Sequence, residues 1–320
     1  MDIPITLKSV ERPDYIEPAR IVQLCYNLTG ISVLAGVEDY TEGIYNGNPC
    51  EDFHSAQRRQ HQYLLDEVKA VPGFRLLEIG CGLGTLLSAA RERGIDATGV
   101  TISEDQWNVC RAKKLPVILA NYKELLHHWR GKFDGIIANG SLEHFCQPED
   151  ALAGQQDGIY SNMFRIFSSL LDPTSASRRV VTTALHFRGK PVNPEKFLKS
   201  PILQLFDSKG LHFSILHRGY GGYYPSEGQL ERCAKGNFKL IQEVDGTEDY
   251  GFTAEDWKRM FRKALYRDGR FGKALARHLI SNPLHTFWFI TSFVGPASQL
   301  WQFRGSTTPV QHFRHTWQAV

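Results

Sequence analysis

The sequence lacks the cysteine pattern of a zinc site or of a disulfide framework. Its six cysteines are scattered and include no CxxC pair, so we expect no metal and a reducing compartment. It also lacks a strong charge of one sign, because 37 Lys and Arg stand against 34 Asp and Glu, a formal net charge of +3. So small an excess gives no general attraction to nucleic acid, which we do not expect as a partner.

Long apolar runs are absent as well. The first residues, MDIPITLKSVERPD, carry charge and proline where a secretory leader has an apolar run. The most apolar stretch, residues 284–303, is interrupted by Gly295 and Pro296. It falls short of the ~20 continuous apolar residues that cross a bilayer. We therefore expect a cytoplasmic protein without a transmembrane segment, and peripheral contact with a membrane stays open.

Residues 74–185 alternate short apolar runs with amphipathic segments. The pattern predicts strands at 74–79, 95–101, 116–120, 133–139 and 178–185, separated by helices at 85–94, 103–114, 122–131 and 156–171. Such alternation is typical of a parallel sheet with helices on both faces. A helix at 226–235, a strand at 238–244, a basic helix at 254–267 and a last strand near 300–305 follow. The sequence thus predicts an α/β fold with a seven-stranded, Rossmann-like sheet.

Two further regions flank this pattern. Residues 1–72 read as a helical amino-terminal cover, with helices at 21–28 and 53–68 and a loop at 39–52. Residues 187–225 contain four prolines among aromatic residues, which predicts a cap inserted over the carboxyl edge of the sheet. The domains expected are therefore a cover at 1–72 and a main domain at 73–320 that carries the cap.

The sharpest motif runs from Glu78 through Gly80, Gly82 and Gly84, after a strand and at the start of a helix. Glycines there let the backbone turn tightly and approach a ligand. A dinucleotide site would need G-x-G-x-x-G and an acid after the second strand. Thr85 replaces the last glycine, and residues 100–103 read VTIS, so this alternative loses ground. A turn that serves only helix packing is the other alternative.

Four blocks in this order, LLEIGCGLGTL, ATGVTISEDQ, LANYKEL and FDGIIANGSLEHF, resemble the cyclopropane-fatty-acyl-phospholipid synthase family. That family includes mycolic acid cyclopropane synthases and relatives that methylate small amines. The likeness covers residues 40–186 and continues more weakly through 221–240 and 249–257. It implies a class I methyltransferase that uses S-adenosylmethionine.

The resemblance also implies which residues hold the cofactor. Either Tyr40 or Thr41 would reach the methionine carboxylate, and the glycines would contact the amino acid and ribose. The complete set expected at the cofactor is Tyr40, Thr41, Glu78, Gly80, Gly82, Gly84, Thr101, Gln106, Asn121, Tyr122, Ser141 and Leu142.

For catalysis the resemblance points to Glu143, His144 and Tyr250. In the family this glutamate and tyrosine help hold a bicarbonate ion that acts as base. The family cysteine that completes the set falls near Glu42 or Gly43 here, and the family histidine falls near Thr183 or Ala184. Bicarbonate is thus expected with an incomplete ligand set. The hypothesis for this chain is that Glu143 itself accepts a proton, against the alternative that it only caps a helix.

The acceptor is expected to be a small molecule or lipid, bound by Phe145, His186, Tyr223 and Tyr224. Aromatic faces stabilise positive charge that develops on carbon or nitrogen. An olefinic carbon of a lipid or isoprenoid is the leading acceptor, through C-methylation or cyclopropanation, and a nitrogen of a small metabolite is the alternative. A cofactor-binding protein without catalysis is the third possibility. Basic residues at 258–277 read as a solvated face or as a site for phosphate or lipid headgroups.

Overall fold

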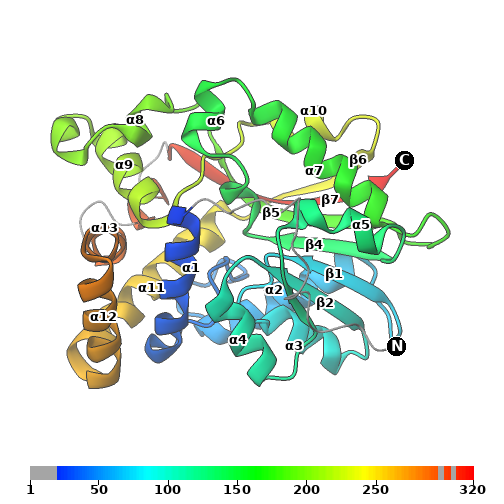
Figure 1. Cartoon of the computed structure of the whole chain (residues 1–320), viewed down its shortest axis with the longest axis horizontal. Helices are drawn as coiled ribbons and strands as arrows, with labels where there is room; N and C mark the ends of the chain where they lie inside the picture. Colours follow the sequence, from blue (N-terminus) through cyan, green and yellow to red (C-terminus); the bar gives the residue numbers. More distant parts are fainter. Residues whose placement is uncertain (1–19, 295–298, 304–307) are drawn as a thin grey trace.

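The computed structural model describes residues 20–294, 299–303 and 308–320 (Figure 1). The sequence predictions about the first fourteen residues and about Gly295 and Pro296 lie outside this range. Among the described helices, none combines the length and apolarity that crossing a bilayer requires.

One mixed sheet of seven strands organises the chain. In chain order its strands are β1 (Arg75–Ile79), β2 (Asp96–Thr101), β3 (Val117–Leu119), β4 (Gly135–Asn139), β5 (Arg179–Phe187), β6 (Phe238–Asp245) and β7 (Val310–Ala319). The spatial order is β3-β2-β1-β4-β5-β7-β6. Strands β1 to β5 pair in parallel, whereas β7 runs antiparallel between β5 and β6. The predicted seven-stranded, Rossmann-like α/β fold is confirmed.

Helices cover both faces of the sheet. They are α2 (Phe53–Glu67), α3 (Thr85–Glu92), α4 (Glu104–Ala112), α5 (Leu126–Trp129), α6 (Pro148–Leu152), α7 (Gln156–Leu170) and α10 (Gln229–Ala234). Alternate side chains of β4 show the two layers: Ile137 belongs to an apolar cluster with α2, α3 and α4, and Ile136 belongs to a larger cluster with α7. Both residues are fully buried, as expected for a central parallel strand.

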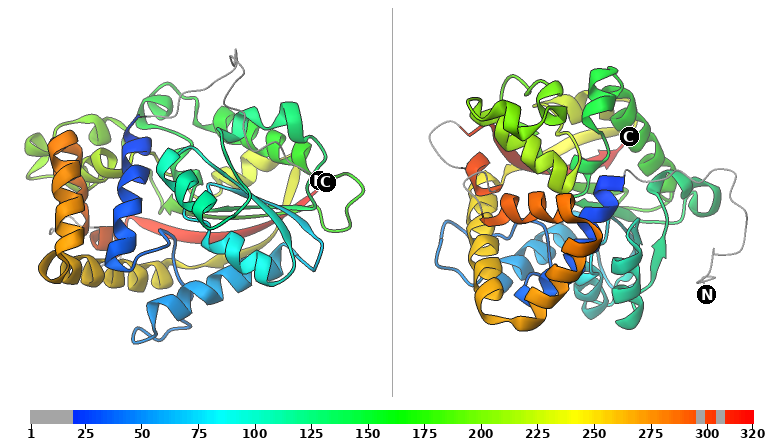
Figure 2. Two further views of the ribbon diagram at one scale, coloured as in Figure 1. Left: turned by 60° about the horizontal axis from the view of Figure 1, so that its bottom comes forward. Right: turned by 60° about the vertical axis from the view of Figure 1, so that its left-hand side comes forward.

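A helical layer lies over the carboxyl edge of the sheet (Figure 2). It contains α1 (Arg20–Ser32), α8 (Glu195–Leu198), the 3₁₀ turn η4 (Pro201–Gln204), α9 (Ser208–Tyr220), α11 (Thr247–Arg267), α12 (Gly269–Ser281) and α13 (Pro283–Val294). Helix α9 packs against α13, α8 and α1. The sequence predicted a helical cover at 1–72, a cap at 187–225 and a basic helix at 254–267, so α12 and α13 are the helices of this layer that were not expected.

The last strand was predicted at the wrong place. Residues 299–303 form a 3₁₀ turn, η5 (Gln299–Phe303), that packs on α11, and the sheet receives β7 instead. Strand β7 reads VQHFRHTWQA, and eight of its ten residues in succession are buried. Its polar side chains find buried partners on both faces: Arg314 pairs with Glu42, and the indole of Trp317 donates to Thr182. A hydropathy pattern does not identify such a buried strand, because many of its residues are polar.

Candidate active site

Two adjoining pockets open at the carboxyl edge of the sheet. The central pocket, about 1100 Å³ including its open mouth, lies among the ends of β1, β4 and β5, the cap helices α8 and α9, and α11. The side pocket, about 1010 Å³, lies beside the ends of β2 and β3. Tyr26, Gly80, Gln106 and His144 line both. A ligand with two parts can therefore place one part in each pocket.

The glycine turn forms the wall between the pockets. Gly80 has φ +77°, and a Cβ there would lie 2.8 Å from the Cβ of Ser141. Gly82 has φ +51° with no atom within 4 Å of where its Cβ would be, and it faces the central pocket. Both positions keep backbone exposed to a ligand. Gly84 differs, because a Cβ there would lie 2.5 Å from Leu115 Cδ1. It lines neither pocket and serves the packing of α3.

The side pocket provides a flat aromatic wall. The rings of Tyr122 and Phe145 stack with centroids 4.4 Å apart, and Thr101, Asn121 and Ser141 complete the wall. The buried hydroxyl of Thr101 donates to Gln106 Oε1 at 2.7 Å. Phe145, predicted at the acceptor, lies instead in this pocket together with predicted cofactor residues. A planar ring with polar edges, such as a purine, fits this arrangement.

Two carboxyl groups face the central pocket next to the glycine turn. Glu78 is buried at the end of β1, and burial first, then the nearby Asp39, raises its pKa well above the usual value. For Asp39 burial also favours the neutral acid, but contacts from His61 and Thr85 outweigh it and lower the pKa. His61 Nε2 lies 3.3 Å from the Asp39 carboxylate. The pKa values of these two neighbouring acids are therefore shifted in opposite directions. Sequence reasoning missed Asp39.

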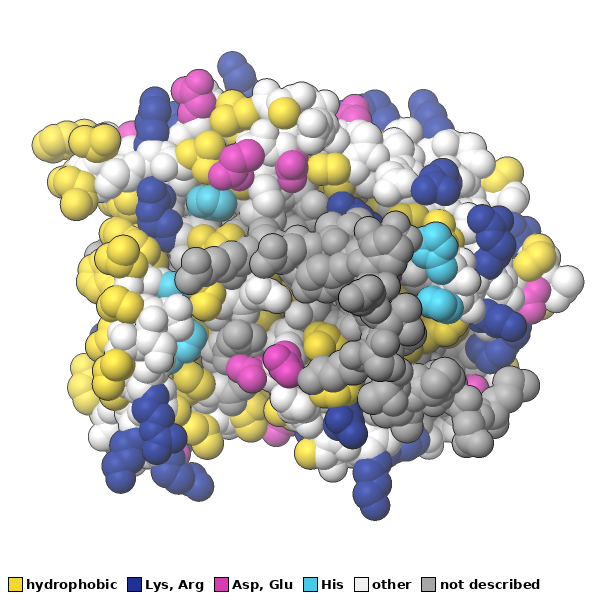
Figure 3. Space-filling model, viewed as in Figure 1, with side chains coloured by type: hydrophobic (Ala, Val, Ile, Leu, Met, Phe, Trp, Pro, Cys, Tyr) yellow, Lys and Arg dark blue, Asp and Glu magenta, His cyan; other side chains and the backbone are white. Residues whose placement is uncertain are grey.

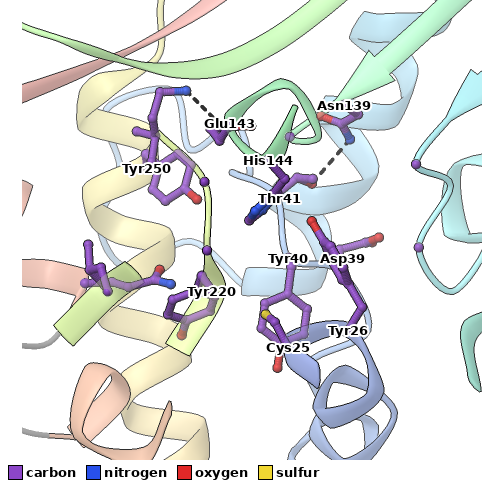
Figure 4. Close-up of a pocket in the computed structure, with 18 of the residues that line it drawn as sticks. Cys25, Tyr26, Asp39, Tyr40, Thr41, Asn139, Glu143, His144, Tyr220 and Tyr250 are labelled. Atoms are coloured by element: carbon purple, nitrogen blue, oxygen red, sulfur yellow. Dashed lines mark hydrogen bonds between the residues drawn. The ribbon is translucent and has the colours of Figure 1, made fainter. Parts of the chain in front are cut away.

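A network of amides and hydroxyls holds the loop before α2 against the end of β4. The Gln60 amide donates to Asn139 Oδ1 at 3.0 Å, and Asn139 donates to the Thr41 hydroxyl at 3.3 Å. Thr183 of β5 donates to Asn139 Oδ1 at 2.8 Å. Thr41 and Asn139 both line the central pocket, and Figure 4 shows them beside Asp39 and Tyr40. Tyr40 lines the same pocket.

Glu143 lies across this pocket in the 3₁₀ turn η3 (Leu142–His144). The backbone N–H of Leu185 donates to its Oε1 at 2.8 Å, and within the described part of the chain its buried Oε2 has no hydrogen-bond partner. Burial raises the pKa of Glu143 to about 7, although the hydrogen bond from Leu185 opposes this shift. A carboxylate with one fixed and one open oxygen, and a pKa near neutrality, is suited to accept a proton.

His144 and Tyr250 also line the central pocket. Burial lowers the pKa of His144 to about 4, so its ring is neutral at pH 7. Burial, followed by the charge of Glu143, raises the pKa of Tyr250 well above its usual value, so it stays a hydroxyl. Tyr224 and Trp257 add two more rings to the pocket, and Figure 4 shows Tyr250 close to Glu143, with Tyr220 lower in the view.

A cluster of buried charged residues lies near Glu143. The Glu42 carboxylate, fully buried, lies 3.0 Å from Arg314 Nε and 3.2 Å from His312 Nε2. Burial alone would raise its pKa, but these two partners hold the pKa of Glu42 at about 2. Arg314 reaches Asp249 of α11 as well, at 2.8 Å. The cluster ties the loop at 42, strand β7 and helix α11 together.

Glu42 also bears on bicarbonate. The resemblance places a ligand cysteine of the family near this position, and here the position holds an ionised carboxylate. The family histidine falls near Thr183 or Ala184; the Thr183 hydroxyl bonds to Asn139, and alanine has no ligand atom. A second anion beside Glu42 would meet like charge and too few donors. The residues present therefore do not fit a bicarbonate ion.

Replacing Arg314 by Met should lower the free energy of unfolding by about 3–5 kcal/mol, because the buried Glu42 would lose one of its two cationic partners, the one that is always charged. Urea denaturation at pH 7 measures the change. The double variant Glu42→Gln/Arg314→Met removes the orphaned charge and should recover part of the loss. Equal losses in the single and double variants would contradict this view of the cluster.

Three further predicted residues lie outside both pockets. Leu142 is fully buried in the apolar core behind Glu143. Tyr223 packs between Phe187 and Phe197, and its hydroxyl donates to the Val192 carbonyl at 2.6 Å. His186 points to the other face of β5, where its ring meets Phe313 and His315. Alternation along the strand explains the last case, because Leu185 is the residue that faces the central pocket.

No group of three His, Cys, Asp or Glu side chains within the described residues is arranged to hold a metal ion. The side chains that line the pockets include carboxyl groups and aromatic rings. The aromatic Trp257, and Asn139 at the end of β4, are among them as well. Asn139 was not in the predicted set, because its place at the pocket depends on how β4 and the loop before α2 meet in space.

Residues 33–270 match the family model described as mycolic acid cyclopropane synthetase. The chain belongs to this family. Cyclopropane mycolic acid synthase 2 of Mycobacterium bovis is 26% identical over 192 residues, which cover 58% of this chain and 61% of that protein. The alignment thus spans about three fifths of the relative's own length.

Solved structures show the same fold over nearly the whole chain. The cyclopropane synthase MmaA2 of Mycobacterium tuberculosis superposes with a TM-score of 0.68 and 17% identity, covering 94% of this chain and 97% of that one. Mycolic acid cyclopropane synthase CmaA1, complexed with SAH and CTAB, gives a TM-score of 0.67 and 19% identity, covering 94% and 99%. The predicted resemblance to the cyclopropane synthase family is confirmed.

Proposed function

We propose that the protein is a methyltransferase that uses S-adenosylmethionine and methylates a hydrophobic acceptor, with an olefinic carbon of a lipid or isoprenoid as the leading acceptor. The observation that carries the proposal is the shared cavity. Gly80 and Gly82 line the same pocket as Glu143, whose buried Oε2 has no hydrogen-bond partner among the described residues. Family membership and a solved relative complexed with SAH support the choice of cofactor.

The residues present fit this cofactor. The stacked Tyr122 and Phe145 would take the adenine, with Thr101 and Gln106 toward the ribose. Asp39, ionised and next to Gly82, would take the methionine ammonium group. When bound, the sulfonium supplies an electrophilic methyl group that needs no further activation. The protein has to hold the acceptor in line with it and keep water out.

Glu143 would act as the proton acceptor. The π electrons of the alkene form the new bond to the methyl carbon as the bond from that carbon to sulfur breaks, which leaves positive charge on the neighbouring carbon. A C–H bond then breaks, its electrons restore an alkene or close a cyclopropane, and the proton passes to Glu143 Oε2. The rings of Tyr224, Tyr250 and Trp257 face the same space and would stabilise the cation.

The rate of methyl transfer should rise with pH through an apparent pKa near 7, because Glu143 accepts a proton only as carboxylate. The same group predicts the opposite trend in stability. Its pKa is raised on folding, so its contribution is complete below the unfolded value of about 4.5 and is lost as pH rises through about 7. Initial rates and denaturation midpoints between pH 5 and pH 9 test both. Glu143→Gln should flatten both profiles, and an unchanged stability profile would argue against the assignment.

Product analysis tests the acceptor class. The protein would be incubated with S-adenosylmethionine and a panel of unsaturated lipids, prenyl diphosphates and small amines, and the products examined by mass spectrometry. A gain of one methyl or methylene unit on an alkene, independent of added bicarbonate, supports the proposal. A methylated amine would replace the acceptor while leaving the cofactor assignment intact. Cofactor binding without transfer to any acceptor would favour a non-catalytic binding protein.

The cytoplasmic location stays a prediction from the sequence.

A further inference from the structure

Two exposed apolar segments lie on the helical layer above the pockets. The first is the cap tip, formed by η4 and the residues after it, in which Ile202, Leu203 and Leu205 are exposed and Phe206 is completely so. The second is the α12–α13 ridge, in which Leu279, Ile280, Leu284 and Phe287 are exposed. Soluble proteins rarely leave so many large apolar side chains in water without a use for them.

The cap tip is held in place from beneath. The Gln204 side chain is buried and its amide donates to the Lys196 carbonyl at 2.9 Å. The ammonium group of Lys196 pairs with Asp207 at 2.6 Å, on the far side of the turn. Arg218 of α9 donates to the Phe197 carbonyl at 3.2 Å. Polar bonds therefore fix the turn that carries the apolar side chains outward.

Helix α9 joins the two apolar segments and connects them to the site. Its outer contacts are with η4 and α13, while Leu216 and Tyr220 on its inner side line the central pocket. Figure 3 shows apolar side chains protruding over the cap and along the α13 edge, on one side of the molecule, with Lys and Arg gathered below them over the α11–α12 corner. The right-hand view of Figure 2 shows α9, α12 and α13 on that same side.

The charge beside the ridge is strongly positive. Residues 262–294 contain six Lys and Arg and one acidic residue, Asp268. All six basic residues are exposed: Arg262, Lys263, Arg267, Arg270, Lys273 and Arg277. Over the whole chain the two signs nearly balance, so this segment concentrates the excess. Basic residues next to exposed apolar ones are typical of proteins that bind the interface of an anionic bilayer.

We propose that the cap tip and the α12–α13 ridge insert into the surface of an anionic lipid bilayer, and that the basic residues at 262–277 bind its headgroups. The apolar side chains stand as separate protrusions on two segments. A fluid lipid interface accepts such protrusions, whereas a protein partner needs a continuous complementary surface. The surface assignment stands on these residues alone. That the membrane is the source of the methyl acceptor rests on the function proposed above.

Vesicle flotation without cofactor tests the surface. The full chain should float with phosphatidylcholine–phosphatidylglycerol vesicles, bind pure phosphatidylcholine vesicles more weakly, and dissociate as salt is raised. Lys263→Glu/Arg267→Glu should weaken vesicle binding about 25-fold or more, because each basic residue near the membrane raises the affinity about fivefold. Leu203→Ser/Phe206→Ser and Ile280→Ser/Phe287→Ser should each weaken it at least about tenfold.

Matched controls lie at the opposite edge of the sheet. Val71→Ser, before β1, and Arg130→Glu, before β4, change equally exposed residues at the amino edge and should leave flotation unchanged. Calorimetric titration with S-adenosylhomocysteine shows that each variant is folded, and it reports on the proposed function separately from lipid binding. Flotation that all three double variants retain would overturn the proposal. So would binding to an acidic carrier protein in place of vesicles.

Discussion

Glu143→Gln should lower kcat for methyl transfer about a thousandfold, within the range of ~10²–10⁴ that a positioned general base contributes. The amide keeps the size of the side chain and can still face the Leu185 N–H, which now bonds to Oε1 at 2.8 Å. It cannot take up a proton from a cationic intermediate. Because Glu143 faces the acceptor side of the cavity, the affinity for S-adenosylmethionine should change little.

Steady-state kinetics together with calorimetry measure both quantities. Glu149→Gln is the matched control, since Glu149 is exposed six residues further along the chain and should show wild-type rates. If Glu143→Gln turns over at the wild-type rate, Glu143 is not the base. Its role would then be to accept the hydrogen bond from Leu185. The alternative from the sequence, a cap for a helix beginning near Pro148, does not apply, because Gln147 is the N-cap of that helix.

Gly82→Ala should weaken S-adenosylmethionine binding by about 10- to 100-fold. Its φ of +51° lies in the left-handed region, so alanine costs about 1–2 kcal/mol of stability. No atom lies within 4 Å of the added methyl group in the free protein, and the group would occupy space that the cofactor needs. The folded protein therefore tolerates the change better than the complex does.

Gly236→Ala separates the two effects. Gly236 has φ +85°, also with open space around a Cβ, but it lies after α10 and outside both pockets. It should show a similar loss of stability in thermal denaturation and unchanged affinity in calorimetry. Equal affinities for the Gly82 and Gly236 variants would contradict a cofactor on the glycine turn.

The alternating strands and helices of residues 74–185 could be predicted because each strand is a short apolar run. In each helix, apolar residues recur every three or four positions. The glycine turn was found for the same reason: its function depends on local backbone geometry. The cofactor side of the cavity, formed by the ends of β1 to β4, follows directly from this order. Thr101, Asn121 and Tyr122 line the side pocket beside these strand ends.

The helical layer over the carboxyl edge of the sheet could not be predicted in the same way. Helices α12 and α13 are amphipathic against α1, α9 and α11, and their packing is not visible in local periodicity. Strand β7 is buried although it contains polar residues such as His312 and Arg314. Their partner, Glu42, is far away in the sequence, so the burial could not be predicted locally. His186 lies outside the pockets because one residue of register on β5 decides which side chain faces them. Tyr223 lies outside because it packs on Phe187 and Phe197, which are distant in the sequence.

Equilibrium titration of the wild-type chain with S-adenosylmethionine tests the central claim most directly. Calorimetry should give one site per chain, competed by S-adenosylhomocysteine and unaffected by NAD or NADP, because residues 100–103 offer no acid to a ribose hydroxyl. Absence of binding, or displacement of the nucleoside by a nicotinamide coenzyme, would contradict the account.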